Sequence, residues 1–323
     1  MHLKKRIFSF LLSVSTIVGL LLTANVPSVF AMQTKPPTDW SFYIRSMDIN
    51  KAYTLGCNQG TFDASHGNIN SEVVLAFGEQ TSTGTYEAGT SNVFFSNYNI
   101  ENLAVIFTQG YFNCLGNDKT SILTLGIGTN NYAYSSYANG QVWANVVKIV
   151  QDFNHSHGWD TRVKTIGAND METSWGGTNS AQNTKAWADG FASVAISDPR
   201  YLDFGDAGGC TAADSSNNFS CNNGWHQSDV WYVSWGALPA YPLPEIYYNP
   251  PPYSPVNAQQ WTMISLYSNQ HKGGRIDIKG PLDENSAQSS NNSDQAWSQL
   301  WTTLNSHSET AQSLTYSAQM HWQ

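Results

Sequence analysis

The chain has 323 residues, with 24 acidic and 15 basic side chains and a formal net charge of −9. Nucleic acids and anionic lipid surfaces require a basic footprint, so this charge argues against both as partners. Only 12% of the residues are charged, while 12 Trp and 16 Tyr are present. This composition is common in extracellular proteins that meet neutral polar polymers, and its aromatic residues suit stacking as well as core packing.

The first 31 residues resemble a secretory signal peptide. Basic residues precede the apolar run 7–22, and Val29 and Ala31 occupy the small positions of a cleavage site. We expect a mature, secreted chain that starts near Met32, with a formal charge of −12 because the removed segment carries three basic residues. An uncleaved anchor is the alternative. No later segment is apolar enough to span a membrane, so no membrane contact is expected after cleavage.

Four cysteines follow the predicted cleavage site, and an even number in an exported chain predicts two disulfides. Cys210 and Cys221 bracket a loop-like segment, so we expect them to pair, which leaves Cys57 with Cys114. Metal ligation is the alternative, but the sequence has neither a CxxC motif nor a nearby cluster of histidines. We therefore predict structural disulfides and no metal site.

Short apolar runs with β-branched residues alternate with helical patterns along the mature chain. Helices are predicted at 141–157, 184–196 and 293–305. Strands are predicted at 72–80, 102–112, 121–131, 162–170, 200–209, 229–237, 261–269, 274–282 and 313–322. Continuous apolar strands that alternate with helices indicate a parallel sheet buried on both faces. The expected fold is an α/β (β/α)8 TIM-like barrel in a single domain, 32–323, with irregular loops between 206 and 290. The sequence has no nucleotide-binding motif, and we expect no cofactor.

In such a barrel the active site lies at the carboxyl ends of the strands. Polar or aromatic groups end most of the predicted strands, and one further pair of polar groups precedes the strand at 261–269. From these positions we expect substrate contacts by Glu79, Asn130, Trp175, Trp235, Gln260 and Tyr267. For Trp235 the alternative is a core position, and for Gln260 it is packing at a strand entry.

The stretch "IGANDMETSWGG" (166–177) carries the sharpest candidates. Asp170 and Glu172 are two positions apart at a strand end, so their side chains point to the same face with Cα atoms roughly 6.6 Å apart. Two carboxyl groups in one pocket suit glycoside hydrolysis with either retention or inversion. We assign Glu172 as the acid, with Asp170 orienting it or stabilising charge. The alternative is that Asp170 caps a turn and Glu172 pairs with a basic residue.

A second candidate lies in "YLDFGDAGGC" (201–210). Asp206 follows an apolar run from what we expect to be a neighbouring strand, and it could act as nucleophile, base or hydrogen-bond acceptor. The alternative is an Asp that stabilises a glycine turn beside a disulfide.

The triplet "DME" at the end of a central strand resembles the Asp-x-Glu motif of glycoside hydrolases such as the family 25 lysozymes and family 18 chitinases. The family 25 resemblance implies that Asp48, in "SMDIN" (46–50), also faces the site. The chitinase pattern has a further Asp where this chain has Ala168. The chain is also similar to exported bacterial proteins described as glycoside-hydrolase-like. These resemblances imply a monomeric enzyme that cleaves a cell-wall or environmental polysaccharide, including peptidoglycan.

Two other functions fit the same sequence. One is a non-catalytic protein that binds carbohydrate or cell wall through the aromatic rim of the barrel. The other is an exported structural or interaction protein in which the carboxylates at the rim have no catalytic role. A serine hydrolase is disfavoured because the chain has no GxSxG motif, and no HExxH motif indicates a zinc hydrolase.

Overall fold

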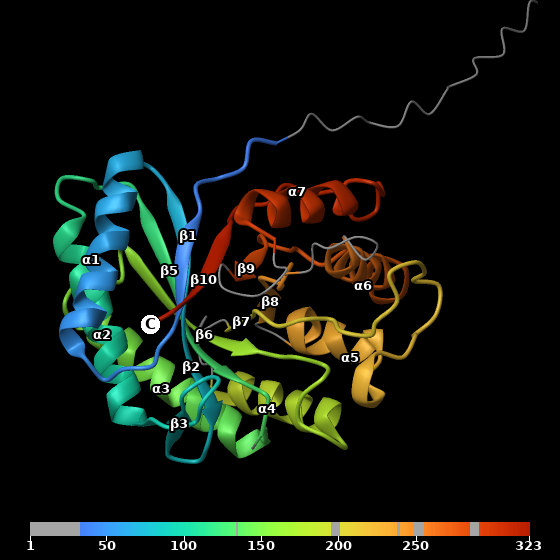
Figure 1. Cartoon of the computed structure of the whole chain (residues 1–323), viewed down its shortest axis with the longest axis horizontal. Coiled ribbons are helices and arrows are strands. Elements are labelled where there is room, and N and C mark those ends of the chain that lie inside the picture. Colours follow the sequence, from blue (N-terminus) through green and yellow to red (C-terminus); the bar gives the residue numbers. More distant parts are fainter. Residues whose placement is uncertain (1–32, 134, 195–200, 238–239, 248–254, 285–290) are drawn as a thin grey trace, which may run out of the picture. The chain divides into compact units, whose positions relative to one another are not determined.

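A parallel β-sheet curled into a half-barrel forms the centre of the fold (Figure 1). The computed structural model describes residues 33–323 except 134, 195–200, 238–239, 248–254 and 285–290, so the predicted signal peptide lies outside the described residues. Eight parallel strands follow the order β8-β7-β6-β5-β2-β1-β10-β9, and an antiparallel pair, β3 and β4, is attached to β2. The strands are β1 (Asp39–Tyr43), β2 (Asn70–Gln80), β3 (Gly84–Tyr86), β4 (Phe94–Ser96), β5 (Ile122–Asn130), β6 (Val163–Asp170), β7 (Tyr201–Asp203), β8 (Ala240–Pro242), β9 (Leu282–Glu284) and β10 (Ala318–Trp322).

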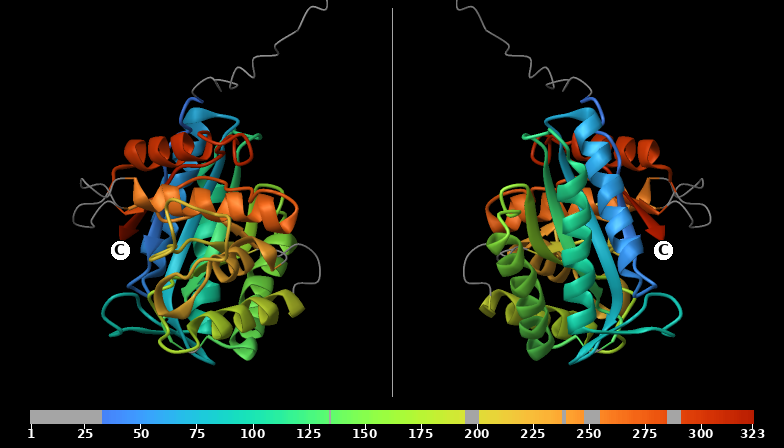
Figure 2. Two further views of the ribbon diagram at one scale, coloured as in Figure 1. Left: turned by 90° about the vertical axis from the view of Figure 1, so that its right-hand side faces the viewer. Right: turned by 90° about the vertical axis from the view of Figure 1, so that its left-hand side faces the viewer.

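Helices follow most of these strands and pack on the outer face of the sheet. The helices of the described residues are α1 (Ile49–His66), α2 (Asn97–Cys114), α3 (Tyr137–Ser156), α4 (Ser180–Val194), α5 (Gln227–Trp231), α6 (Val256–Lys272) and α7 (Ser293–Leu304). Figure 2 shows α1 and α2 running side by side over the sheet. Within the described part of the chain, no helix has the length and hydropathy needed to cross a membrane.

Two apolar clusters lie on opposite faces of the sheet. The larger joins the helices to outward residues such as Val73 and Leu75. The buried members of the smaller cluster come from the strands and their immediate flanks, including Val74, Ala76 and Ala168. Alternate residues of β2 thus enter different clusters, as expected for a strand buried on both faces. The inner cluster fills the concave side of the sheet beneath the carboxyl ends of the strands.

A β-bulge interrupts this alternation near the end of β2. The register with β5 shifts between Ala76 and Glu79, and Gly78 has φ +92°. A Cβ atom on Gly78 would lie 2.3 Å from the carbonyl oxygen of Tyr86, so both the backbone conformation and the space favour glycine. After the bulge Glu79 faces inward and Gln80 faces the helices, where it accepts a hydrogen bond from the indole of Trp187 (2.7 Å).

Three predicted strands are wrong. Residues 102–112 belong to α2, which Ser96 caps in a reciprocal arrangement with Asn99 and which buries Leu103 and Phe107 at helical spacing. Residues 261–269 belong to α6; the segment from Trp261 to Ser268 is buried throughout, so its helical period is not visible in the sequence. Residues 229–237 form α5 and a π-helix, Tyr232–Gly236.

Other predictions hold with shifted boundaries. The strands at 72–80, 121–131 and 162–170 correspond to β2, β5 and β6, and the three predicted helices correspond to α3, α4 and α7. The strand at 200–209 shortens to β7, and the strand at 274–282 begins only at Leu282. The strand at 313–322 shortens to β10. The prediction omitted β1 and α1, whose sequences show little apolar periodicity, and the three-residue strands β3, β4 and β8.

Both disulfide pairings are confirmed. Cys57–Cys114 connects α1 to α2, and Cys210–Cys221 closes the loop that follows β7. Glycine allows the two helices to approach closely, because a Cβ on Gly56 would lie 1.9 Å from the carbonyl oxygen of Phe107. The first disulfide therefore connects two helices whose backbones are almost in contact.

Candidate active site

A cavity of about 430 Å³ opens at the carboxyl ends of the strands. Its walls come from the ends of β1, β2, β5, β6, β9 and β10 and from the loops that follow β3, β5, β6 and β8. The lining residues are Tyr43, Glu79, Glu87, Ala88, Gly89, Ser91, Asn130, Tyr132, Asp170, Glu172, Trp175, Glu245, Tyr247, Glu284 and Trp322. This is the end of a parallel sheet at which α/β proteins place ligands.

Three carboxyl groups meet in this cavity. One oxygen each from Asp170, Glu172 and Glu245 lie within 4.8 Å of one another. Asp170 ends β6 and is 2% exposed, and Glu245, three residues beyond β8, is 4% exposed. Glu172 is the most accessible of the three and is only partly buried. The predicted pairing of Asp170 and Glu172 on one face is thus present, and Glu245 joins them from a separate segment.

Asn131 fixes the backbone that carries Glu172. The N–H of Glu172 donates to the side-chain oxygen of Asn131 (3.0 Å), and the Asn131 amide donates to the carbonyl oxygen of Glu172 (3.1 Å). The same amide donates to the hydroxyl of Thr184 on α4 (3.2 Å), and the N–H of Asn131 donates to the carbonyl oxygen of Asp170. These bonds hold the loop after β6 against its neighbours, so the position of Glu172 is well defined.

Burial and mutual repulsion favour the protonated forms of all three carboxyl groups. Burial, together with repulsion by Asp206, raises the pKa of Glu172 to about 8. The pKa values of Asp170 and Glu245 are raised well above the ordinary range, first by burial and then by the other carboxylates of the cluster. The neighbouring hydroxyl group of Tyr247 partly opposes this shift by lowering the pKa of Glu245. The cluster therefore keeps Glu172 protonated at neutral pH, while Tyr247 favours the ionised form of Glu245.

The raised pKa of Glu172 predicts a pH-dependent stability. Between its usual pKa of 4.5 and about 8, the folded protein binds more protons than the unfolded chain, so the free energy of unfolding falls as the pH rises. Glu172→Gln should remove this loss and stabilise the protein at pH 9 by at least about 1 kcal/mol, a value discounted for partial exposure from 1.36 kcal/mol per pKa unit. Thermal unfolding between pH 5 and 9 measures the effect.

Glu309→Gln is the matched control, because Glu309 is exposed and lies outside the cavity. Its unfolding temperature should follow the wild-type pH profile. Parallel profiles for Glu172→Gln and the wild type would contradict the assignment of a raised pKa to Glu172.

Aromatic and acidic side chains surround the opening. Tyr132 and Trp175 pack edge to face, with ring centroids 5.9 Å apart. The indole of Trp322 donates to Glu284 (2.5 Å). Aromatic rings that stand beside hydrogen-bonding groups are suited to contact with the faces and hydroxyl groups of sugars.

The structure brings some of the predicted substrate residues to this cavity and places others elsewhere. Glu79, Asn130 and Trp175 line it. Asp48 is instead the N-cap of α1 and accepts from the N–H groups of Asn50 and Lys51, which follows from its position immediately before a helix.

The remaining three predicted residues lie outside the cavity lining because their segments are helical. Trp235, in the π-helix, packs against the apolar clusters. Gln260 is buried on α6 and donates to the carbonyl oxygen of Cys210 (2.9 Å), and Tyr267 is buried on the same helix against His271. All three therefore have structural contacts away from the predicted rim.

Asp206 stabilises a glycine turn beside the second disulfide. Its Oδ1 accepts from the N–H groups of Gly208 (3.1 Å) and Thr173 (3.4 Å). It does not line the cavity, but its charge contributes to the raised pKa of Glu172. These contacts match the structural alternative considered for this residue, and Asp206 acts on the cluster through its electrostatic field.

The sequence reasoning missed Glu245, Glu284 and Trp322. Glu245 follows "AYPLP", whose prolines and three-residue strand hide the usual strand pattern. Glu284 lies two residues beyond the predicted end of its strand. Trp322 ends β10, and extending the search for strand-end residues to this last strand would have found it.

Asp170, Glu172 and Glu245 are also the described residues whose spacing would allow them to hold a metal ion. Carboxylate oxygens are the ligands preferred by hard cations such as Ca²⁺ and Mg²⁺. The sequence predicted no metal here; the raised pKa values suit the cluster to acid–base chemistry, and its spacing suits it to holding a cation.

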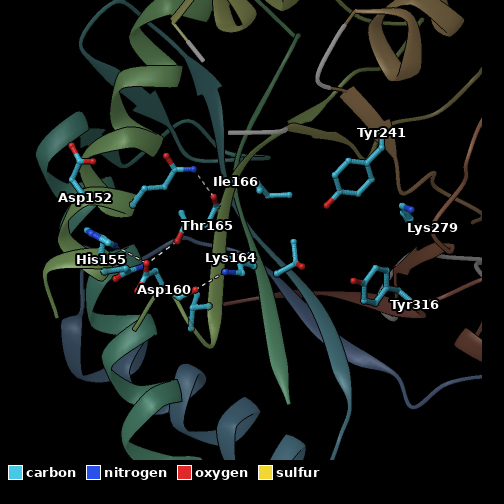
Figure 3. A pocket seen from close by; sticks show the side chains of 13 residues that line it. Asp152, His155, Asp160, Lys164, Thr165, Ile166, Tyr241, Lys279 and Tyr316 are labelled. Atoms are coloured by element: carbon cyan, nitrogen blue, oxygen red, sulfur yellow. Dashed lines mark hydrogen bonds and ion pairs between the residues drawn. The ribbon is translucent and has the colours of Figure 1, made fainter. Parts of the chain in front are cut away.

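A second cavity, of about 570 Å³, lies at the opposite end of the sheet (Figure 3). Here His155 bonds to Asp160 (2.7 Å), and Lys164 donates to the carbonyl oxygen of Asp160 (2.7 Å). Figure 3 shows Tyr241 and Tyr316 across the cavity from these groups. Because His155 and Asp160 pair with each other and this cavity lies at the amino ends of the strands, we place the candidate active site at the carboxyl ends.

The chain matches no protein-family model and no curated protein sequence. The geometry and electrostatics of the cavity are therefore the basis for assigning a function.

Proposed function

We propose that this protein is a secreted glycoside hydrolase that cleaves a cell-wall or environmental polysaccharide by carboxylate catalysis. The observation that carries the proposal is the meeting of Asp170, Glu172 and Glu245 in one open cavity with aromatic walls. A protonated acid beside a second carboxyl group is the arrangement that glycoside hydrolysis requires. The resemblance of the "DME" triplet to glycoside hydrolase motifs supports the same reaction.

The proposed acid is Glu172, because its pKa of about 8 keeps it protonated at neutral pH and it is the most accessible member of the cluster. Glu245 is the proposed nucleophile. Tyr247 favours its ionised form, and protonation of Asp170 and Glu172 removes two repelling charges. Asp170 stays protonated, because burial and the neighbouring carboxylates raise its pKa, and it adds no negative charge beside the pair.

In the first step Glu172 donates its proton to the glycosidic oxygen as the bond to the sugar breaks, and Glu245 bonds to the anomeric carbon. In the second step Glu172 takes a proton from water, which displaces Glu245 and regenerates both groups. Carboxyl groups about 5 to 5.5 Å apart catalyse this double displacement, whereas inverting pairs are about 6.5 to 9.5 Å apart. Oxygen atoms within 4.8 Å favour the retaining reaction.

Product analysis tests this mechanism. The mature chain is incubated with chitin, chitosan, peptidoglycan and plant glucans, and new reducing ends are measured. We expect cleavage of at least one polymer, with the first product detected by NMR carrying the same anomeric configuration as the substrate. An inverted first product would contradict the nucleophilic role of Glu245, and the absence of reducing ends from every polymer would contradict the hydrolase proposal.

A non-catalytic carbohydrate-binding protein is the second candidate, and the placement of Asp206 favours it. That carboxylate, expected to assist catalysis, is occupied in a glycine turn. A binding protein would retain a polysaccharide on an affinity gel without releasing reducing ends, and Glu172→Gln would leave no catalytic defect to detect.

We also propose that the sheet closes into a (β/α)8 barrel. Hydrogen bonds from the N–H of Leu282 to the carbonyl oxygen of Pro244 (2.9 Å) and from the N–H of Ile246 to that of Leu282 (2.9 Å) support closure between the segment after β8 and β9. A parallel bridge joins Glu245 and Leu282. Slow hydrogen exchange at the amides of Ile246 and Leu282 is expected for a closed barrel, and fast exchange at both would oppose it.

Export is supported by the two disulfides and by the signal-peptide-like segment 1–31. We expect mass spectrometry of the secreted protein to find a chain that starts near Met32. Retention of the full chain in the cell would contradict this part of the proposal.

A further inference from the structure

We propose that the site takes a polysaccharide with free amino groups, such as a glucosamine polymer, in preference to the same polymer in N-acetylated form. This inference rests on the proposed function, because it names the substrate class of that active site. It comes from the charge of the cavity and from buried oxygen atoms that lack hydrogen-bond donors.

Acidic side chains dominate the described lining of the cavity. Its described lining contains six carboxyl side chains and no Lys, Arg or His: Glu79, Glu87, Asp170, Glu172, Glu245 and Glu284. Arg45 lies nearby, but it forms an ion pair with Glu87 (3.7 Å) and lies over the ring of Trp322 (5.3 Å). Such a lining favours a positively charged ligand, which stabilises the ionised carboxylates, over uronic acids and other anionic sugars.

Three buried oxygen atoms of the cavity lining have no hydrogen-bond partner among the described residues: Oδ1 of Asp170, Oε1 of Glu245 and the hydroxyl oxygen of Tyr247. The two carboxyl side chains are more than nine-tenths buried. A buried acceptor without a donor is costly, so these atoms favour a ligand that brings donors. An ammonium group offers three donors and a charge, whereas an N-acetyl group offers one N–H and adds bulk.

Cation binding at this cluster should be linked to proton release. An ammonium group close to the carboxylates favours their ionised forms, and the pKa values of Asp170, Glu172 and Glu245 are all raised in the free protein. Proton release on binding is therefore a signature that neutral sugars, which recognise the site through hydrogen bonds and stacking, should not produce to the same extent.

The test compares two oligosaccharides that differ only in acetylation. Titration calorimetry in EDTA measures binding of the β-1,4-linked glucosamine hexamer and of its fully N-acetylated form to the mature protein, in buffers of different ionisation enthalpy. We expect at least tenfold tighter binding of the amino form, with protons released. Equal or tighter binding of the acetylated form would overturn the inference. So would a preference that appears only when divalent metal is added, because the cation recognised would then be the metal.

Two variants distinguish the effect of a carboxylate inside the cavity from the effect of the same substitution on the exposed surface. Glu79→Gln removes a carboxylate from the cavity and should weaken binding of the amino hexamer several-fold while changing binding of the acetylated hexamer little. Glu309→Gln, which makes the same change on the exposed surface, should leave both affinities as they are. Equal weakening of both ligands by Glu79→Gln would assign that residue to packing and contradict a charge-based preference.

Failure of this inference and failure of the proposed function would give different results. Preferential binding of the amino hexamer without cleavage would overturn the hydrolase assignment and leave the ligand class in place. Preferential binding and cleavage of the acetylated hexamer would support the hydrolase and overturn the ligand class.

Discussion

Glu172→Gln is expected to lower the rate of polysaccharide cleavage by about 10²- to 10⁴-fold, the contribution typical of a positioned general acid. Gln keeps the size of the side chain but has no proton to give to the leaving oxygen. The backbone of residue 172 should stay in place, because the Asn131 side chain bonds to its N–H and carbonyl oxygen. The measurement is kcat with a defined oligosaccharide at pH 6 to 7.

A second substrate with a good leaving group tests whether Glu172 acts as the acid. An aryl glycoside with an acidic phenol needs little protonation, so its first step should be much less affected by Glu172→Gln than that of a natural glycoside. Glu309→Gln serves again as the control on the exposed surface. An equal loss of rate for both substrates would show that Glu172 does not act as the acid.

Removal of the Cys57–Cys114 disulfide should have the largest effect on stability. The two cysteines are 57 positions apart, and the chain-entropy relation gives a loss of about 4 kcal/mol for the Cys57→Ser/Cys114→Ser double variant. In the unfolded chain the bond limits the conformations of the segments that form α1 and α2. In the folded protein these helices form one side of the outer core. Urea unfolding of the two proteins under non-reducing conditions measures the loss.

The other disulfide provides the comparison. Cys210 and Cys221 are 11 positions apart, and the same relation gives about 3 kcal/mol for their replacement by Ser. This loop contacts the segment after Glu172, because Asn222 donates to the hydroxyl of Ser174 (2.9 Å). The second variant should therefore reduce activity more than the first. A greater loss of stability from the shorter loop would contradict the entropic explanation.

The sequence predicted the parallel sheet best where strands are long and continuously apolar. β2, β5 and β6 have eleven, nine and eight residues, and their patterns identify both the strands and their polar ends. The pairing of Asp170 with Glu172 follows from the two-residue period of β6, which also places Ala168 in the inner cluster. An Asp at 168 would enter this apolar cluster, so its absence is consistent with local packing.

The prediction failed where tertiary packing hides the period. The segment of α6 from Trp261 to Ser268 is buried throughout, so it shows no separate polar face from which a helical period could be read. The strands β7, β8 and β9 have three residues each, too few to show alternation. Glu245 follows one of these short strands. The third carboxylate of the cluster could thus be found only from contacts between segments distant in the sequence.

The bulge at Gly78 gives adjacent residues of one strand separate tasks. Without it, strict alternation from Ala76 would send Gln80 toward the cavity and Glu79 toward the helices. With it, Glu79 lines the cavity. Gln80 accepts a hydrogen bond from the indole of Trp187 and donates one to the carbonyl oxygen of Asn139 (2.8 Å). Changes at 79 should therefore alter ligand preference with little effect on folding. Changes at 80 should weaken the packing of α3 and α4 against the sheet, while the residues that line the cavity stay the same. Selection can therefore change ligand recognition at position 79 and the stability of the fold at position 80 independently.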